Sequence, residues 1–114
     1  MIKRIAGAVE TRSRAVVHDG LVFTVATAAN KRPSLYEQTR ETLAAIDKNL
    51  ADAGSHKSRI LSATVYITDM AQKPEMNRAW DEWVDTANPP QRACIGVTLA
   101  DKDLVEILVT AVQK

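Results

Sequence analysis

Several residue types are scarce in this sequence, and each scarcity excludes a class of protein. The chain has one cysteine, Cys94, among 114 residues. A single thiol excludes an intrachain disulfide framework and a cysteine-based zinc site, which needs several thiolates at close spacing. His18 and His56 have no paired spacing to other ligands, and no glycine-rich phosphate loop is present. We therefore expect no metal and no cofactor.

The sequence also lacks a large excess of charge of one sign and a long uninterrupted apolar run. The 15 basic and 14 acidic residues leave a net charge of +1, and aromatic residues make up only 4% of the chain. This composition gives nucleic acid little electrostatic attraction and few stacking platforms, so we expect no nucleic-acid partner. The longest apolar stretch, 15–29, is interrupted and shorter than the roughly 20 residues that span a bilayer. With no signal peptide visible, we expect a cytoplasmic protein without a membrane partner.

The remaining composition is typical of a folded protein. Hydrophobic residues make up 46% of the chain and charged residues 25%, which is the balance of a globular domain and not of a disordered segment. The length matches one ordinary domain. We therefore expect a single domain over residues 1–114.

The first half of the chain predicts a hairpin followed by a helix. Two runs rich in β-branched residues, 15–18 and 21–25, flank Asp19-Gly20, a pair that supplies the two positive φ angles of a type I′ turn. Ser34 and Glu37 have the spacing of a capping box, in which each side chain accepts from the other residue's amide. Gly54 follows where a left-handed C′ residue is expected. The helix should therefore run from Ser34 to about Ala53.

The second half predicts a strand, a helix and two more strands. The segment 59–68 is dense in β-forming residues. Pro74 suits the first turn of a helix whose apolar stripe runs from Met76 to Ala87, and 88–90, Asn-Pro-Pro, should stop it. Two strands, 93–99 and 104–112, are joined by the polar turn 100–103.

This element order predicts an α+β fold, a two-layer sandwich in which two helices cover one face of a mixed β-sheet. The last strand is almost continuously apolar, which indicates burial on both faces. Because the two helices cover only one face, we expect a second subunit to cover the other.

Two charged residues in the last two strands are candidates for chemistry. Glu106 lies between Val105 and Ile107, where an ionised carboxylate is costly unless it is paired. It is either a structural ion-pair partner or a proton acceptor and donor. Arg92 follows the rigid Pro89-Pro90 turn, so it is either an ordinary solvated residue or a clamp for a carboxylate.

Two further polar or reactive residues lie near this pair in the sequence or on the neighbouring helix. Cys94 should point to the same side of its strand as Arg92, because side chains alternate along a strand. No neighbouring residue marks its thiol as a nucleophile. Asn77, a polar residue beside Met76 on the second helix, is a cap, a surface group or part of a site.

Over nearly its whole length the chain resembles the reactive intermediate deaminase family, the Rid or YjgF-like proteins. One match is the arginine at 92 with a cysteine two residues on and, later, a glutamate before an isoleucine at 106–107. The other is the asparagine at 77 that precedes Trp80 by three residues.

The resemblance implies a chorismate-mutase-like α+β fold and a homotrimer with clefts at its subunit interfaces. It implies that Arg92 holds a small carboxylate substrate, that Glu106 positions a water for attack on an imine, and that Cys94 contributes mainly its backbone amide. The expected activity is hydrolytic deamination of a reactive enamine or imine, releasing ammonia and a 2-oxo acid. The alternative is a non-catalytic trimer that binds a small keto or amino acid in the same cleft.

The chain also departs from the family pattern, as a divergent subgroup would. Arg12 stands where the family has an aromatic residue, and Val25-Ala26 replaces a serine-glycine pair. Arg12 either suits a more acidic substrate or is simply exposed. If the last two strands paired as a hairpin, Glu106 would lie roughly 17 Å from the position opposite Arg92. Only the resemblance puts the two residues in one cleft.

Overall fold

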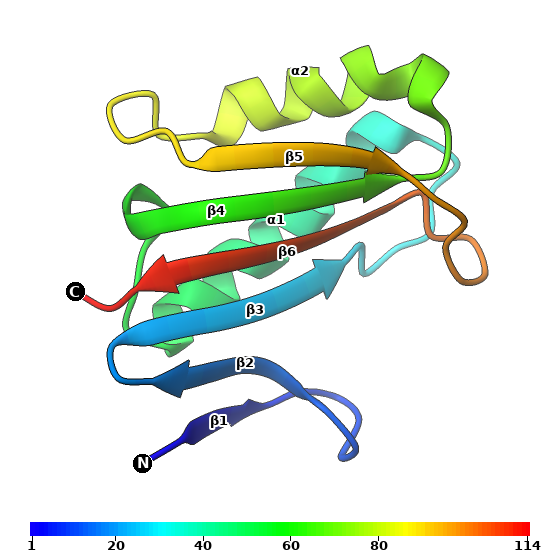
Figure 1. Ribbon diagram of the computed structural model, residues 1–114. Helices are drawn as coiled ribbons and strands as arrows, with labels where there is room; N and C mark the ends of the chain where they lie inside the picture. Colours follow the sequence, from blue (N-terminus) through cyan, green and yellow to red (C-terminus); the bar gives the residue numbers. More distant parts are fainter.

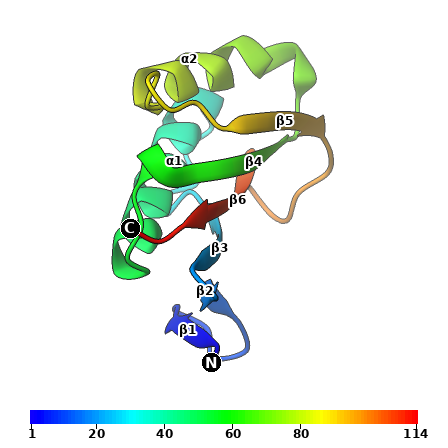
Figure 2. The same ribbon diagram turned by 60° about the vertical axis from the view of Figure 1, so that its left-hand side comes forward.

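The computed structural model describes residues 1–114 and contains one mixed β-sheet covered on one face by two helices (Figures 1 and 2). The sheet order is β1-β2-β3-β6-β4-β5, and only β4 and β5 are parallel. This confirms the expected α+β class. The elements are β1 (Lys3–Ala6), β2 (Ser13–His18), β3 (Leu21–Thr27), α1 (Leu35–Asp52), β4 (Ile60–Ile67), α2 (Lys73–Trp83), β5 (Gln91–Gly96) and β6 (Val105–Val112), with two short 3₁₀ turns at Lys57–Arg59 and Met70–Gln72.

Local sequence signals predicted the first hairpin and both ends of α1. Asp19 and Gly20 have φ angles of 50° and 79°, as a type I′ turn requires. Ser34 Oγ accepts from the Glu37 amide at 3.2 Å, and Gly54 has φ of 80° after the helix ends. Only half of the capping box forms, because the Glu37 carboxylate lies 3.7 Å from Arg40 instead of reaching back to Ser34.

The second helix is shorter than expected. It ends at Trp83, and Val84 is already extended, with ψ of 145°. The Asp85 carboxylate accepts from the Ala87 amide at 3.0 Å and from the Asn88 side chain at 3.0 Å. Such local side-chain bonds compete with helical ones, so Ala87 lies in a turn and not on the helix.

The sheet differs from the expectation in two ways. The N-terminal strand β1 was not predicted, and it adds to the edge of the sheet beside β2. The last two strands are not paired with each other, because β4 lies between β5 and β6. The loop after β5 therefore crosses one strand before β6 begins (Figure 1).

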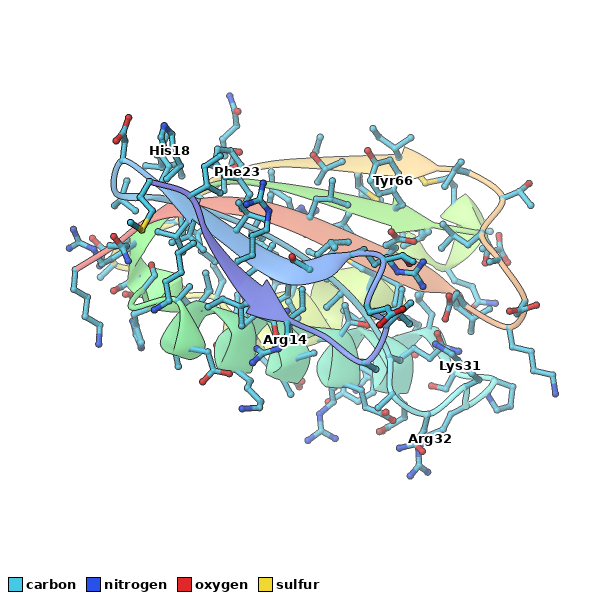
Figure 3. All side chains as sticks on the ribbon, turned by 90° about the horizontal axis from the view of Figure 1, so that it is seen from below. Arg14, His18, Phe23, Lys31, Arg32 and Tyr66 are labelled. Atoms are coloured by element: carbon cyan, nitrogen blue, oxygen red, sulfur yellow. The ribbon has the colours of Figure 1, made fainter.

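Side chains of β6 alternate between the two faces of the sheet. Val105, Ile107 and Val109 are buried under the helices, with exposures between 0% and 4%, whereas Leu108 is 40% exposed on the other face. The predicted burial on both faces is therefore not met within one chain. We call the uncovered side of the sheet, which presents Phe23, Val25 and Leu108, the open face. Figure 3 shows Phe23 and Tyr66 projecting from it, away from the helices.

The fully buried side chain of Gln38 ties α1 to the loop that leads into β6. Its Nε2 donates to the carbonyls of Arg32 at 2.8 Å and Lys102 at 3.0 Å. Its Oε1 accepts from the Leu104 amide at 3.0 Å. These bonds fix the start of β6 two residues before Glu106.

Neither helix is long and apolar enough to cross a membrane.

Replacing Gln38 by leucine should destabilise the fold by about 1–3 kcal/mol, because it removes three hydrogen bonds to part-buried backbone groups. Urea denaturation, comparing midpoints at an unchanged slope, measures the loss. Gln72→Leu, at an exposed position before α2, is the control and should change stability by less than about 0.5 kcal/mol. Equal midpoints for the two variants would show that Gln38 does not hold the loop.

Candidate functional site

Arg92 lies on the helix-covered side of edge strand β5, opposite Ala63. Its half-buried guanidinium is held by α2. Nη2 donates to Asn77 Oδ1 at 2.8 Å, and Nη1 lies 3.6 Å from Met76 Sδ. The guanidinium carbon lies 5.3 Å from the centre of the Trp80 ring, a cation–π contact. We call Met76, Asn77 and Trp80 the α2 clamp.

The α2 clamp orients Arg92 without neutralising it. Met76 and Trp80 are four residues apart and Asn77 and Trp80 three apart, so both Met76 and Asn77 neighbour Trp80 on the helix surface. None of them is acidic, and Arg92 forms no ion pair. The positive charge is therefore free to pair with an anionic ligand, in the planar two-donor geometry that suits a carboxylate.

Cys94 lies on the same side of β5 as Arg92, as predicted, with its half-buried free thiol against the core. The amide of Val97 donates to the Ile67 carbonyl of β4 at 3.0 Å. Backbone groups point alternately to the two sides of a strand, so the amides of Cys94 and Arg92 face the unpaired edge of β5. These amides are free hydrogen-bond donors beside the Arg92 guanidinium.

Glu106 lies on the open face, opposite Thr27 of β3 and Tyr66 of β4. It is half-buried, forms no ion pair, and lines a hollow of about 580 Å³. Arg12, on the connection between β1 and β2, is exposed, lines the same hollow and also forms no ion pair. Val25 and Ala26 are also among the residues that line it.

The other charged groups of this hollow are already paired. Arg14 Nη2 lies 2.7 Å from Asp52, and this hydrogen bond, with a second from Lys48, lowers the pKa of Asp52. Asp103 is paired with Lys31. Among the charged groups that line the hollow, Arg12 and Glu106 are therefore the two left without a partner.

The structure thus brings the predicted residues together in two groups and not in one. Arg92, Asn77 and Cys94 gather beside α2, whereas Glu106 and Arg12 share the hollow on the open face. In the plane of the sheet Arg92 and Glu106 are three residues and two strand spacings apart, about 14 Å. Their side chains also point to opposite faces, so the two residues do not meet within one chain.

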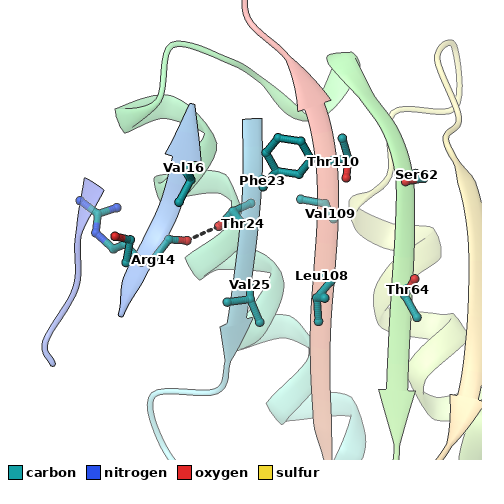
Figure 4. Close-up of a pocket in the computed structure, with 11 residues that line it drawn as sticks. Arg14, Val16, Phe23, Thr24, Val25, Ser62, Thr64, Leu108, Val109 and Thr110 are labelled. Carbon is teal, nitrogen blue, oxygen red and sulfur yellow. Dashed lines mark hydrogen bonds between the residues drawn. The ribbon is translucent and has the colours of Figure 1, made fainter. Parts of the chain in front are cut away.

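A second hollow, of about 370 Å³, lies farther along the open face (Figure 4). Phe23, Leu108 and Thr110 line it, and the Thr24 hydroxyl donates to the Arg14 carbonyl at 2.6 Å beneath it. Arg14 is its one charged residue, and that side chain is paired with Asp52. The surface has the character of a contact area and not of a catalytic site.

Sequence reasoning missed the two apolar members of the α2 clamp. Trp80 was assigned to the core, and it is 94% buried in agreement with that expectation, since its exposure is 6%. The same ring also faces Arg92. The sequence signal that could have revealed this contact is the spacing of Met76 and Trp80, four residues apart on the helix that precedes the strand of Arg92.

No group of three or more His, Cys, Asp or Glu side chains is arranged to hold a metal ion.

Comparison with known proteins identifies the family. The family model described as "Endoribonuclease L-PSP" matches residues 2–113. A RutC family protein of Haemophilus ducreyi is 45% identical over 101 residues, which cover 87% of this chain and 86% of the relative. The RutC family protein YoaB of Escherichia coli is 37% identical over 100 residues, covering 87% and 88% of the two chains.

Solved structures of similar fold point to the same family. A YjgF family member from Neisseria meningitidis has a TM-score of 0.95 and 38% identity, with coverage of 100% of this chain and 96% of the other. A protein of the conserved Rid family from Yersinia pestis has a TM-score of 0.87 and 26% identity, with coverage of 96% and 93%. The chain therefore belongs to the YjgF/RutC/Rid family.

If Arg92 binds a small carboxylate, Asn77→Ala should weaken that binding about tenfold, because the guanidinium loses a charge-assisted hydrogen bond that orients it. Isothermal titration with 2-oxobutyrate, a ligand that does not turn over, gives the dissociation constant. Asn30→Ala, an exposed position outside both groups, should leave that constant unchanged. Equal affinities for the two variants would mean that Asn77 does not position Arg92.

Proposed function

We propose that this protein is a hydrolytic deaminase of reactive enamines and imines of small carboxylates, which it converts to 2-oxo acids and ammonia. The observation that carries the proposal is a pair of unpartnered charges: the Arg92 cation in the α2 clamp and the Glu106 carboxylate in the open-face hollow. The resemblance of their sequence surroundings to the Rid motif, and the family membership, give each charge its role.

The reaction needs little from the protein. The enamine first takes a proton at carbon and becomes the imine. Water then adds across the carbon–nitrogen double bond, its oxygen bonding to carbon and its proton passing to nitrogen. The carbinolamine loses ammonia as the carbon–nitrogen bond breaks and the carbonyl forms. One well-placed acid–base group contributes about 10²–10⁴-fold to such steps.

Each residue then has a defined part. Arg92, oriented by Asn77, binds the substrate carboxylate, and the free amide of Cys94 donates a second hydrogen bond. Glu106 accepts a proton from the attacking water and returns it to the departing nitrogen. Positioning the water and the imine together adds the advantage of a reaction within one complex.

Because Arg92 and Glu106 lie on opposite faces of one sheet, we propose that each site forms between two subunits of a homotrimer. The apolar open face supports assembly: Phe23 is 45% exposed, Leu108 40% and Val25 36%. Packing this face against a second copy removes apolar surface from water. In this proposed trimer, the unpaired edge of β5 in one copy lies beside the Glu106 hollow of the next.

The second candidate is a trimeric binding protein that captures a small keto or amino acid without turnover. The observation that favours it is the altered wall of the hollow, where Arg12, Val25 and Ala26 stand in place of the family's aromatic and serine-glycine positions. The two functions differ in one measurable respect, since only the deaminase speeds the release of ammonia.

The proposed activity predicts faster release of ammonia and 2-oxo acid when an amino-acid oxidase generates imines in situ. Glu106→Gln should lower the rate constant of the added protein by about 10²–10⁴-fold, and Arg92→Ala should act mainly by raising KM. Asp81→Asn, on the exposed surface of α2, is the matched control for loss of a carboxylate. Binding of 2-oxobutyrate without acceleration of any imine would replace the deaminase by the binding protein.

The interfacial site predicts complementation between two variants that are each impaired at low substrate concentration. When Arg92→Ala and Glu106→Gln chains are unfolded together and refolded as mixtures, some interfaces combine an intact Arg92 with an intact Glu106. Random assembly of a threefold ring leaves about one quarter of the sites intact. With substrate far below the KM of the Arg92→Ala variant, the mixture should therefore recover about a quarter of the wild-type rate, while each variant refolded alone shows almost none.

A further change separates assembly from chemistry. Leu108→Glu places a charge in the centre of the open face and should prevent assembly. Light scattering should then give the mass of one 12.5 kDa chain and not of three. The same change introduced into both impaired chains should abolish complementation. Ala44→Glu, on the exposed surface of α1, should leave it intact. A wild-type protein that is active as a monomer would refute the interfacial site.

A further inference from the structure

The Glu106 hollow contains a cation that the proposed reaction does not use. Arg12 lines this hollow, its guanidinium forms no ion pair or hydrogen bond, and it does not neutralise Glu106. An arginine side chain offers five donors in a planar fork, suited to two-point binding of a carboxylate. The hollow therefore has an unused anion-binding group on the wall that also carries the proposed catalytic carboxylate.

The surroundings of Arg12 favour an anionic ligand group over other kinds. Asp103, the other acidic residue of the hollow, is paired with Lys31 and so does not compete for Arg12. Arg14 adds positive charge nearby but already donates to Asp52 and Asn49. Arg12 is exposed, so beside an aliphatic substrate tail its donors would bond only to water, and a basic tail would be repelled.

The size of the hollow is also sufficient. Its volume of about 580 Å³ lies within the range of small-molecule sites, about 300–1,000 Å³. Val25 and Thr27, which lie on the open face of β3, line the hollow with small side chains, and Ala26 between them packs against the core. Arg12 and Glu106 line the same hollow, and its volume leaves room for an acid longer than the smallest 2-imino acids.

We infer that the preferred substrates are 2-imino dicarboxylates, with the carboxylate next to the imine bound by Arg92 and the second carboxylate bound by Arg12. This inference rests on the proposed function. Water adds to the imine carbon and ammonia leaves, so a 2-imino dicarboxylate and water give a 2-oxo dicarboxylate and ammonia. Arg12 takes no part in bond making and acts as a specificity-determining residue.

The first test compares two imines of nearly the same size. An amino-acid oxidase generates the imine of aspartate, which carries a second carboxylate, or the imine of asparagine, which carries an uncharged amide in its place. Ammonia release is measured for the wild type, Arg12→Gln and Arg12→Lys. Arg40→Gln, which removes an exposed arginine from α1 on the other layer, is the matched control.

The expected result is a selective loss. Arg12→Gln should lower kcat/KM for the aspartate imine about tenfold, as for a charge-assisted hydrogen bond, and leave that for the asparagine imine within about twofold. Arg12→Lys should recover part of the difference, and Arg40→Gln should match the wild type. An equal effect of Arg12→Gln on both imines, or no effect on either, would overturn the inference while the deaminase remained established.

A binding measurement keeps the two proposals separable if no imine is turned over. Titration with 2-oxoglutarate and with 2-oxopentanoate compares five-carbon acids with and without the second carboxylate. A preference for 2-oxoglutarate of about tenfold that disappears in Arg12→Gln supports Arg12 as the second carboxylate site, even in a protein without turnover. Equal affinities for the two acids would refute that site.

Discussion

The position of β6 in the centre of the sheet is the constraint on which the rest of the arrangement depends. This strand pairs with β3 on one side and β4 on the other, so its register is held from both edges. Its odd residues Val105, Ile107 and Val109 fill the core, and alternation then sends Glu106 to the open face. A slip of one residue would expose three core side chains and bury a carboxylate, which makes the register strongly specified.

The same constraint separates the two halves of the candidate site. β5 pairs only with β4, and Arg92 shares the core side with Ala63, where α2 can reach it. Glu106 faces the opposite way, so one chain offers a carboxylate-binding cation and an acid–base group on different surfaces. In the proposed trimer, catalysis then depends on assembly, because the interface that buries Phe23 and Leu108 also completes the site.

Local rules predicted the parts of the fold that depend on neighbouring residues. Asp19-Gly20, Ser34 and Gly54 each act over a few residues, and the structure has a turn, a cap and a helix end there. Strand order depends on pairings between distant segments, and β6 joins β4 across the whole of α2 and β5, so no local pattern revealed it. The predicted faces of Arg92 and Cys94 relative to each other were correct, whereas their relation to Glu106 required the strand order.

The two arginines of the site are held in different ways, and the difference suits their proposed roles. Arg92 lies on β5, and its guanidinium contacts three side chains of α2: the amide of Asn77, the thioether of Met76 and the indole of Trp80. Every substrate of the proposed class has a carboxylate next to the imine, so a rigid group is suited to bind it. Arg12 lies on the connection between β1 and β2, with no side-chain partner. Loops tolerate substitution more readily than paired strands. The substrate tail, which differs between imino acids, is therefore bound by a loop residue whose substitution leaves β6 undisturbed.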